Sequence, residues 1–550
     1  MMSGQARQRL LLAAGCDWLE AQRDTVPYQS GGGKRNNVQI GVGRSLWSGS
    51  APPPIPERAL DGIPGCLAWL TLLFSVASAL AFPRVVLTMA AFLGAYSTLR
   101  FFLAGIANVI GMRRIREWEQ IDWKAKYDAE HAAHPDVMPW HAVRHLVIVP
   151  NYTEAPSILR RTLENLAAQY EAKQRMTVVL AMEAAEQGAA AKAEALIAEF
   201  GHRFEHIMYT LHPRGLPGEM IGKSSNQAWA ARQAKRRLVD ELGCDINQIV
   251  ISTMDADTMW HPHYFFSLTY LFASSPHRYA RTWQSPIRYH GNIWDITPPM
   301  RLVNAYAGAF ELAYLAASWW QAIPISSYSY SLRLLDASGY WDTDVIAEDA
   351  HMYIKAFFSS NAELELEPVF LPFLATATTG GSVWEVVKLR YGQSLRHAWG
   401  SKEVGYIIAR MMEHPEIPAG RSLKLLIRVA HDILLAGAGW MILTVGSQLP
   451  VLFNPGLVPP LSQLTQDPVY AVLILSAAAV VVLGIVFWAQ DVASRPPRTQ
   501  PITLRERLLT LVSFPLLPVL TLIFVALPVL HAQTRLLLGG SLQYQVARKI

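Results

Sequence analysis

Two aspartates separated by one residue follow an apolar run near the middle of the 550-residue chain. Asp255 and Asp257 stand directly after QIVISTM, residues 248–254. Carboxylate oxygens are the ligands that hard divalent cations such as Mg²⁺ or Mn²⁺ prefer, and a cation held in this way can bind a diphosphate. The pattern D-x-D is also common on solvated loops, but two charges at the end of a buried strand are costly unless they bind a partner. The pair is therefore predicted to hold a metal ion.

A second acidic pair, Glu348 and Asp349, precedes the apolar segment HMYIKAFF. Acidic side chains are favoured in the first turn of a helix, so these residues could simply cap one. A carboxylate in a cleft could instead act as a general base that takes the proton of an attacking hydroxyl. Adjacent acids can divide these roles, one facing a cleft and one held by backbone donors, and the sequence leaves the choice open.

The segment QSLRHAWG, residues 393–400, combines polar, basic and aromatic side chains at helical spacing. Gln393 and Arg396 fall on one helical face, with Trp399 one turn further along. Arg396 can pair with phosphate oxygens, and Trp399 can stack on a sugar ring or a base. The same pattern fits an amphipathic helix on a membrane with its tryptophan at the interface, and the two roles are compatible.

Lys223 lies in GKSSN, residues 222–226, which opens a predicted helix. Backbone N–H groups and a lysine at such a position can meet an anion. The glycine spacing is not that of a Walker A loop, and a solvated lysine is the simpler alternative. Sixteen histidines and three cysteines show neither zinc-like spacing nor a disulfide framework.

The elements that must position these residues alternate between two periodicities. Apolar runs at 145–150, 176–182, 206–212 and 248–254 predict strands, and the segments 157–169, 189–200, 223–242 and 263–273 predict helices. Continuous rather than alternating apolar strands indicate a mostly parallel α/β sheet that is covered on both faces. Ligands of such sheets bind beyond the carboxyl ends of the strands, so residues 150–154, Glu183 and the aspartate pair should meet at one edge.

The rest of the chain is too apolar for a wholly soluble enzyme. Hydrophobic residues make up 51% and charged residues 17%, against roughly 25% charged in an ordinary soluble domain. A membrane-spanning helix needs about 20 apolar residues. Five runs qualify by length: 63–82, 85–110, 433–453, 468–490 and 508–530. The net charge of +5 is too small to argue for nucleic acid.

Two details of the membrane part stay open. Arg100 lies inside the second run, where it could snorkel to the cytoplasmic interface, the favoured alternative, or line a polar path between helices. The last run contains Pro515, Pro518 and Pro528. It either crosses the membrane once or dips in and returns, which leaves five or six crossings.

Basic residues flanking the spans predict that residues 112–428 face the cytoplasm, in a protein integral to the inner membrane. The predicted organisation has six parts: a flexible tail over 1–62, a transmembrane hairpin over 63–111, a cytoplasmic catalytic domain over 112–400, interfacial helices over 401–428, C-terminal transmembrane helices over 429–531 and a tail over 532–550.

Five motifs taken in order resemble the membrane-integrated family 2 glycosyltransferases, the group that includes cellulose- and hyaluronan-synthase-like enzymes. They are VIVPNYTEAPSILRRTLENLAAQ, GKSSNQA, STMDADT, VIAEDAHMYIK and QSLRHAWG, and they cover about 145–400. The membrane runs on either side fit the same layout. The resemblance implies a Rossmann-like GT-A fold and metal-dependent, inverting transfer of a hexosyl or N-acetylhexosaminyl group from a nucleotide-diphospho-sugar. The implied acceptor is a polysaccharide or a lipid-linked molecule.

The resemblance also implies roles for individual residues. Asp255 and Asp257 match the nucleotide- and metal-binding pair, with Mg²⁺ or Mn²⁺ as cofactor, and Asp349, beside Glu348, matches the catalytic base. The implied donor-binding residues are Pro150, Tyr152, Glu154, Glu183, Lys223 and Asn226. The implied acceptor and diphosphate residues are Gln393, Arg396 and Trp399.

Three positions depart from the family pattern. Glu183 replaces an aspartate, which weakens the expectation of uracil recognition, and Ala347 replaces a threonine. His397 replaces the tryptophan of Q-x-x-R-W, which weakens the expectation of processivity. Transfer to a glycolipid or polyprenyl lipid is the alternative activity, and a silent membrane scaffold or transporter is the remaining one.

Overall fold

The computed structural model describes residues 55–457, 459–460, 464–498, 500–540 and 542. The predicted N-terminal tail up to residue 54 and the last residues of the predicted C-terminal tail lie outside these ranges. Helix α2 (Glu57–Ala81) begins before residue 63, so the end of the predicted tail is helical.

A seven-stranded sheet forms the centre of the soluble part, in the order β3-β2-β1-β4-β7-β5-β8. The first four strands run parallel, as their continuous apolar pattern predicts, and β7 is antiparallel to both neighbours. The bounds are β1 Arg144–Asn151, β2 Met176–Glu183, β3 His206–His212, β4 Ile249–Thr253, β5 Arg281–Gln284, β7 Tyr328–Ser331 and β8 Glu365–Pro368. A second, two-stranded sheet pairs β6 (Ile287–Arg288) with β9 (Phe373–Leu374).

Helices cover this sheet, and one hydrophobic cluster joins the strands to α8, α11, α12 and α14. The helices of the soluble part are α4 Trp123–Ala133, α5 Pro156–Ala167, α6 Ala172–Arg175, α7 Ala189–Phe200, α8 Lys223–Lys235, α9 Tyr264–Ser274, α10 Pro298–Ala316, α11 Leu332–Ala337, α12 Glu348–Ser359, α13 Val383–Ala398 and α14 Lys402–Glu413. The predicted mostly parallel α/β architecture is confirmed.

Among the residues that the structure describes, five helical stretches are long and apolar enough to cross a membrane. They are α2, α3 (Pro83–Glu119), the stretch Ala419–Phe453 that contains α15 (Ala419–Leu434) and α16 (Leu449–Phe453), α17 (Pro468–Ala493), and the stretch Leu517–Leu537 that contains α19 (Leu517–Thr521) and α20 (Leu527–Leu537). Large apolar side chains such as Phe74 on α2 and Phe92 on α3 are exposed, as a lipid-facing surface requires. The predicted boundary at residue 428 falls inside α15.

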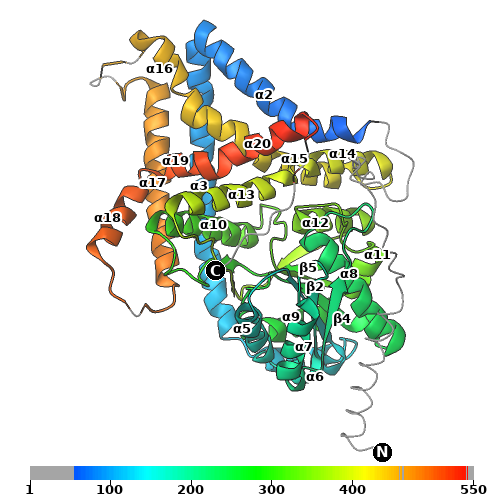
Figure 1. Ribbon diagram of the computed structural model, residues 1–550. Coiled ribbons are helices and arrows are strands. Elements are labelled where there is room, and N and C mark those ends of the chain that lie inside the picture. Colours follow the sequence, from blue (N-terminus) through cyan, green and yellow to red (C-terminus); the bar gives the residue numbers. More distant parts are fainter. Residues whose placement is uncertain (1–54, 458, 461–463, 499, 541, 543–550) are drawn as a thin grey trace, which may run out of the picture. The chain divides into compact units, whose positions relative to one another are not determined.

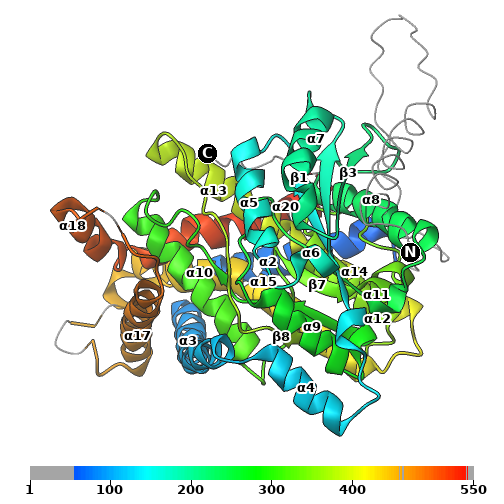
Figure 2. The ribbon, with the colours of Figure 1, turned by 90° about the horizontal axis from the view of Figure 1, so that it is seen from below.

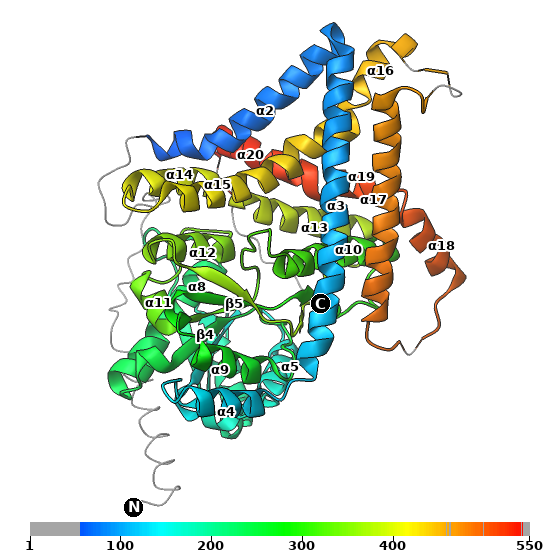
Figure 3. The same cartoon turned by 180° about the vertical axis from the view of Figure 1, so that it is seen from behind.

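The last of these stretches does not run in the direction of α3 and α17. Those two helices run side by side, whereas α20 lies crosswise to them (Figures 1 and 2). Helix α20 packs against both α2 and α13 (Figure 3). The predicted run 508–530 is also divided, because α18 (Leu504–Ser513) ends before Pro515 and a separate helix begins at Leu517.

Close backbone packing joins α2 to the domain that contains the seven-stranded sheet. A methyl group added to Gly405 of α14 would lie 2.7 Å from the backbone carbon and oxygen of Leu60 in α2. Only glycine allows this approach, so α14 anchors the soluble domain directly on the first membrane helix.

We therefore expect Gly405→Ala to lower the free energy of unfolding by about 1–3 kcal/mol, because the added methyl overpacks the contact. Gly420→Ala in α15 is the matched control, since no heavy atom of the described chain lies within 4 Å of a methyl built there. Thermal unfolding of both variants in detergent measures the difference. Equal melting temperatures would contradict this account of the contact.

Candidate active site

A cavity of about 550 Å³ lies at the carboxyl ends of the parallel strands, where such sheets bind ligands. It extends from the segment after β1 to the faces of α13 and α15. The predicted site residues that line it are Pro150, Tyr152, Glu154, Glu183, Lys223, Asn226, Asp255, Glu348, Asp349, Gln393 and Arg396. Asp257 and Trp399 are the two that do not.

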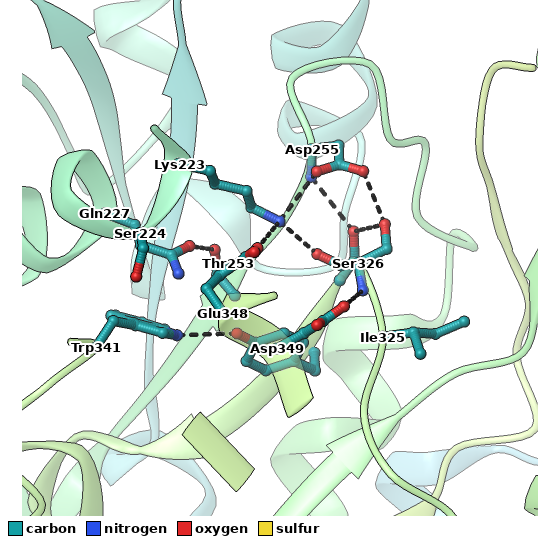
Figure 4. Close-up of polar contacts among 12 residues, drawn as sticks. Lys223, Ser224, Gln227, Thr253, Asp255, Ile325, Ser326, Trp341, Glu348 and Asp349 are labelled. Carbon is teal, nitrogen blue, oxygen red and sulfur yellow. Dashed lines mark hydrogen bonds and ion pairs between the residues drawn. The ribbon is translucent and has the colours of Figure 1, made fainter. Parts of the chain in front are cut away.

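The ammonium group of Lys223 occupies the centre of an acidic cluster (Figure 4). Its Nζ lies 3.0 Å from Asp255 Oδ1 and 3.0 Å from Glu348 Oε1, and it donates to the backbone carbonyl of Ser326 at 2.8 Å. Lys223 opens α8, Asp255 follows β4 and Glu348 opens α12, so the cluster joins three separate elements. This lysine is not a solvated side chain.

Ser326 connects the two acidic pairs that the sequence singled out. Its backbone N–H donates to Asp349 Oδ2 at 2.9 Å, and its hydroxyl donates to Asp255 Oδ2 at 2.8 Å. Its backbone has a φ of 57°, a left-handed conformation that costs a non-glycine residue energy. The surrounding structure holds this serine in place so that it can reach both aspartates.

The buried charges of the cluster shift one another's proton affinity. Burial opposes the charged form of Lys223, but the carboxylates of Asp255 and Glu348 outweigh it and raise its pKa. Burial raises the pKa of Glu348 to about 7, although Lys223 opposes this shift. Lys223 therefore remains a cation in the cavity, and Glu348 titrates close to neutral pH.

The two acids at the start of α12 divide their roles. Asp349 accepts backbone hydrogen bonds from Ser326 and, at 2.8 Å, from Ala350, whereas Glu348 is paired with Lys223. Both residues belong to the first turn of α12, where acidic side chains are favoured, but no side chain caps this helix by a hydrogen bond. Both residues also line the cavity.

The two predicted metal-binding aspartates have different surroundings. Asp255 lines the cavity, whereas Asp257 does not line it and is buried, with the residue 2% exposed. The chain turns after β4, where the N–H of Thr258 donates to the carbonyl of Asp255 at 3.0 Å. Alternate residues face one side only in an extended strand, so this turn separates the two carboxylates.

The predicted donor-binding residues on the strand-end side are held by local hydrogen bonds. Glu154 accepts from the N–H of Tyr152 at 2.6 Å, and the amide of Asn226 donates to a strand carbonyl, that of Ala181, at 2.8 Å. Glu183 Oε2 lies 3.0 Å from Nδ1 of a histidine, His212. The carboxylate of Glu183 is thereby oriented at the cavity wall.

The face of α13 supplies the basic side of the cavity. Gln393, Arg396 and His397 line it. Burial, with Arg390 nearby, lowers the pKa of His397 to about 4, so its imidazole is neutral. Trp399, which was predicted to stack on a ligand, does not line the cavity; its ring packs in a hydrophobic cluster with Leu536 of α20.

The sequence analysis missed the residues that close the cavity toward the membrane helices. Glu311 and Tyr314 of α10 and Arg428 and Asp432 of α15 line this side. Arg100 donates to Tyr314 Oη at 2.8 Å and to Asp432 at 3.1 Å, so it does not snorkel but belongs to a polar cluster between helices. Arg100 inside one apolar run and Asp432 directly before another were a signal that such a pair forms; Ser326 carried no signal.

The carboxylate of Asp255 is the type of ligand that the predicted Mg²⁺ or Mn²⁺ prefers. Among the residues the structure describes, no three His, Cys, Asp or Glu side chains are arranged to enclose a metal ion by themselves. Mg²⁺ is bound in most proteins by one or two carboxylates together with substrate phosphates and water, so it needs no such cage. Asp255 at the cavity wall fits this mode of binding.

No protein-family model matches this sequence, and no curated protein matches it. A mannosyltransferase from Pyrobaculum calidifontis in complex with GDP-Man and Mn²⁺ is structurally similar, with 16% identity, coverage of 73% of this chain and 100% of that one, and a TM-score of 0.40. S. aureus TarS follows with 12% identity, 66% and 57% coverage and a TM-score of 0.28. GalNAc-T7 with UDP, GalNAc and Mn²⁺ has 11% identity, 55% and 57% coverage and a TM-score of 0.30. Similarity at this level assigns neither a family nor an activity to this chain.

A buried histidine ties α12, which carries the acidic pair, to α14. His351 Nδ1 lies 2.9 Å from Glu403 of α14, and its Nε2 lies 3.0 Å from Asp342. Burial opposes the imidazolium, but Glu403 and Asp342 outweigh it and raise the pKa of His351 to about 9. The folded protein therefore holds a proton here that the unfolded chain releases near its ordinary pKa of 6.5.

We expect this group to contribute about 3 kcal/mol of stability, fully present below pH 6.5 and lost as the pH rises through about 9. Melting temperatures measured from pH 6 to pH 10 should fall in this window, and His351→Gln should flatten the fall. A wild-type profile parallel to that of the variant would show that His351 is not charged in the folded protein.

Proposed function

We propose that this protein is an inverting membrane glycosyltransferase that moves a sugar from a nucleotide-diphospho-sugar to a polysaccharide or lipid-linked acceptor. The observation that carries the proposal is the single cavity in which Asp255, Glu348 and Asp349 converge with Lys223 at the strand ends. Sugar transfer needs an anion-binding side and a proton acceptor within reach of one small molecule, and this cavity offers both.

The donor lies on the strand-end side in this proposal. Residues 150–154, Glu183 and Asn226 contact the nucleotide, and Arg396 pairs with the diphosphate. Asp255, with Asp257 two residues further along the chain, would hold Mg²⁺ or Mn²⁺. Such a cation, when bound, offsets negative charge on the leaving diphosphate.

Asp349 takes the proton of the acceptor hydroxyl. The hydroxyl oxygen bonds to the anomeric carbon as the bond from that carbon to the diphosphate breaks, on the opposite face, so the centre is inverted in one step. The backbone donors from Ser326 and Ala350 hold the Asp349 carboxylate in its orientation. Glu348 stays paired with Lys223 and balances the charge beside it.

The membrane helices determine on which side the catalytic domain lies and from where the acceptor approaches in this proposal. The basic residues beside the spans support a catalytic domain on the cytoplasmic face of the inner membrane. The polar cluster of Arg100, Tyr314 and Asp432 supports an acceptor that approaches from the membrane helices. Nucleic acid has no part in this function.

Two variants separate the proposed roles. Asp349→Asn should lower turnover by about 10²–10⁴-fold while donor affinity stays within about twofold, because a general base acts only in the chemical step. Asp255→Asn should weaken metal-dependent donor binding as well. The measurements are donor affinity and product mass, with purified protein, Mn²⁺ or Mg²⁺, a panel of nucleotide-sugars and membrane lipid extract.

Chelation of the metal should weaken donor binding in the wild-type protein and have little further effect on Asp255→Asn. Glu199→Gln, an exposed acid of α7 paired with Arg160, is the control variant. Equal and mild effects of both aspartate variants would contradict the division of roles. Absence of both transfer and donor hydrolysis would favour a silent scaffold or transporter.

A further inference from the structure

The cavity continues beyond Asp349 toward the membrane helices, and this half has no role in donor binding. Its wall is formed by side chains of α10 and α15: Glu311, Tyr314, Arg428, Asp432 and Ile433. If the donor lies on the strand-end side, as in the proposed function, an attacking hydroxyl reaches Asp349 from this half.

Both guanidinium groups of this half are engaged by the protein. The guanidinium of Arg428 pairs with Asp432 and donates to the carbonyl of Gln321 at 2.7 Å. Arg100 is bound to the same aspartate and to Tyr314. An anionic group that entered here would compete with Asp432 for these two cations.

Glu311 is a charged side chain of this half that could hydrogen-bond to a ligand. No hydrogen bond or ion pair joins it to another residue in the described part of the chain, although it is half-buried at the cavity wall. Burial raises the pKa of Glu311 to about 7; Arg428 opposes the shift, and Asp432 and Asp349 add to it. A carboxyl group of this kind can both accept from and donate to a sugar hydroxyl.

We propose that Glu311 binds a hydroxyl of the acceptor and makes this half of the cavity select an uncharged sugar over a lipid phosphate. The inference rests on the proposed function and adds the acceptor's chemical class. A phosphate would lie beside the carboxylates of Glu311 and Asp349, and like charges in a buried site repel strongly. A neutral sugar pairs with the same groups without that cost, whether it ends a glycan or heads a glycolipid.

The test uses the full chain in lipid nanodiscs and a nucleotide-sugar that the wild-type protein turns over. The acceptors are soluble neutral oligosaccharides, octyl glycosides and phytanyl phosphate. Glu311→Ala should raise the KM for neutral acceptors by about 3- to 10-fold, the effect of one lost hydrogen bond, while donor affinity changes less than twofold. Glu311→Gln keeps the hydrogen bond and removes the charge. It should hold the neutral-acceptor KM within about threefold and increase transfer to phytanyl phosphate relative to neutral acceptors.

Glu199→Ala is the control, because it removes an exposed acid that is far from this wall in the sequence. It should change neither the KM for neutral acceptors nor the KM for phytanyl phosphate. Transfer to oligosaccharides or to octyl glycosides supports the inference and identifies the source of the sugar. Wild-type preference for phytanyl phosphate, or an unchanged acceptor KM in Glu311→Ala with its melting temperature intact, would overturn it. Loss of transfer to every acceptor by the wild-type protein would instead contradict the proposed function.

Discussion

A buried ammonium group among carboxylates is the constraint on which the rest of the site depends. Burying unpaired charge costs several kcal/mol, so the charges of Asp255, Glu348 and Lys223 are tolerable only when they lie together. Lys223 meets this requirement by bonding to both acids and to the carbonyl of Ser326. The start of α8, the end of β4, the segment before β7 and the start of α12 are thereby fixed around one point.

This point lies at the sheet edge where parallel strands end, and the same topology explains how much the sequence could predict. The four apolar runs became β1 to β4 because continuous apolar strands need cover on both faces. Segments that follow such strands meet at one edge, so the place of the cavity and the acidic residues at its centre were predictable. The positions of Asp257 and Trp399 were not, since a turn and a contact with α20 decide where these side chains point. The role of Ser326 could not be predicted either. It depends on a left-handed backbone conformation that the neighbouring residues in the sequence do not indicate.

The membrane helices also position elements of the cavity. Helix α14 packs on α2 through Gly405, and α20 lies across the bundle against α13, which carries Arg396. Hydropathy identifies apolar runs but not their direction, so it could not show that α20 lies across α3 and α17. The Arg100–Asp432 pair likewise required knowledge of which helices are neighbours. These contacts place a polar wall, not an apolar one, between the acidic centre and the lipid-facing helices.

The central claim is that one nucleotide-sugar lies between the strand ends and α13, with its reacting carbon facing Asp349. A structure of the full chain determined by electron cryo-microscopy with a nucleoside diphosphate and Mn²⁺ tests this claim most directly. The account predicts that the diphosphate lies between Asp255 and Arg396 and leaves the half of the cavity beside Glu311 open. A nucleotide bound in that half, or outside the cavity altogether, would contradict it.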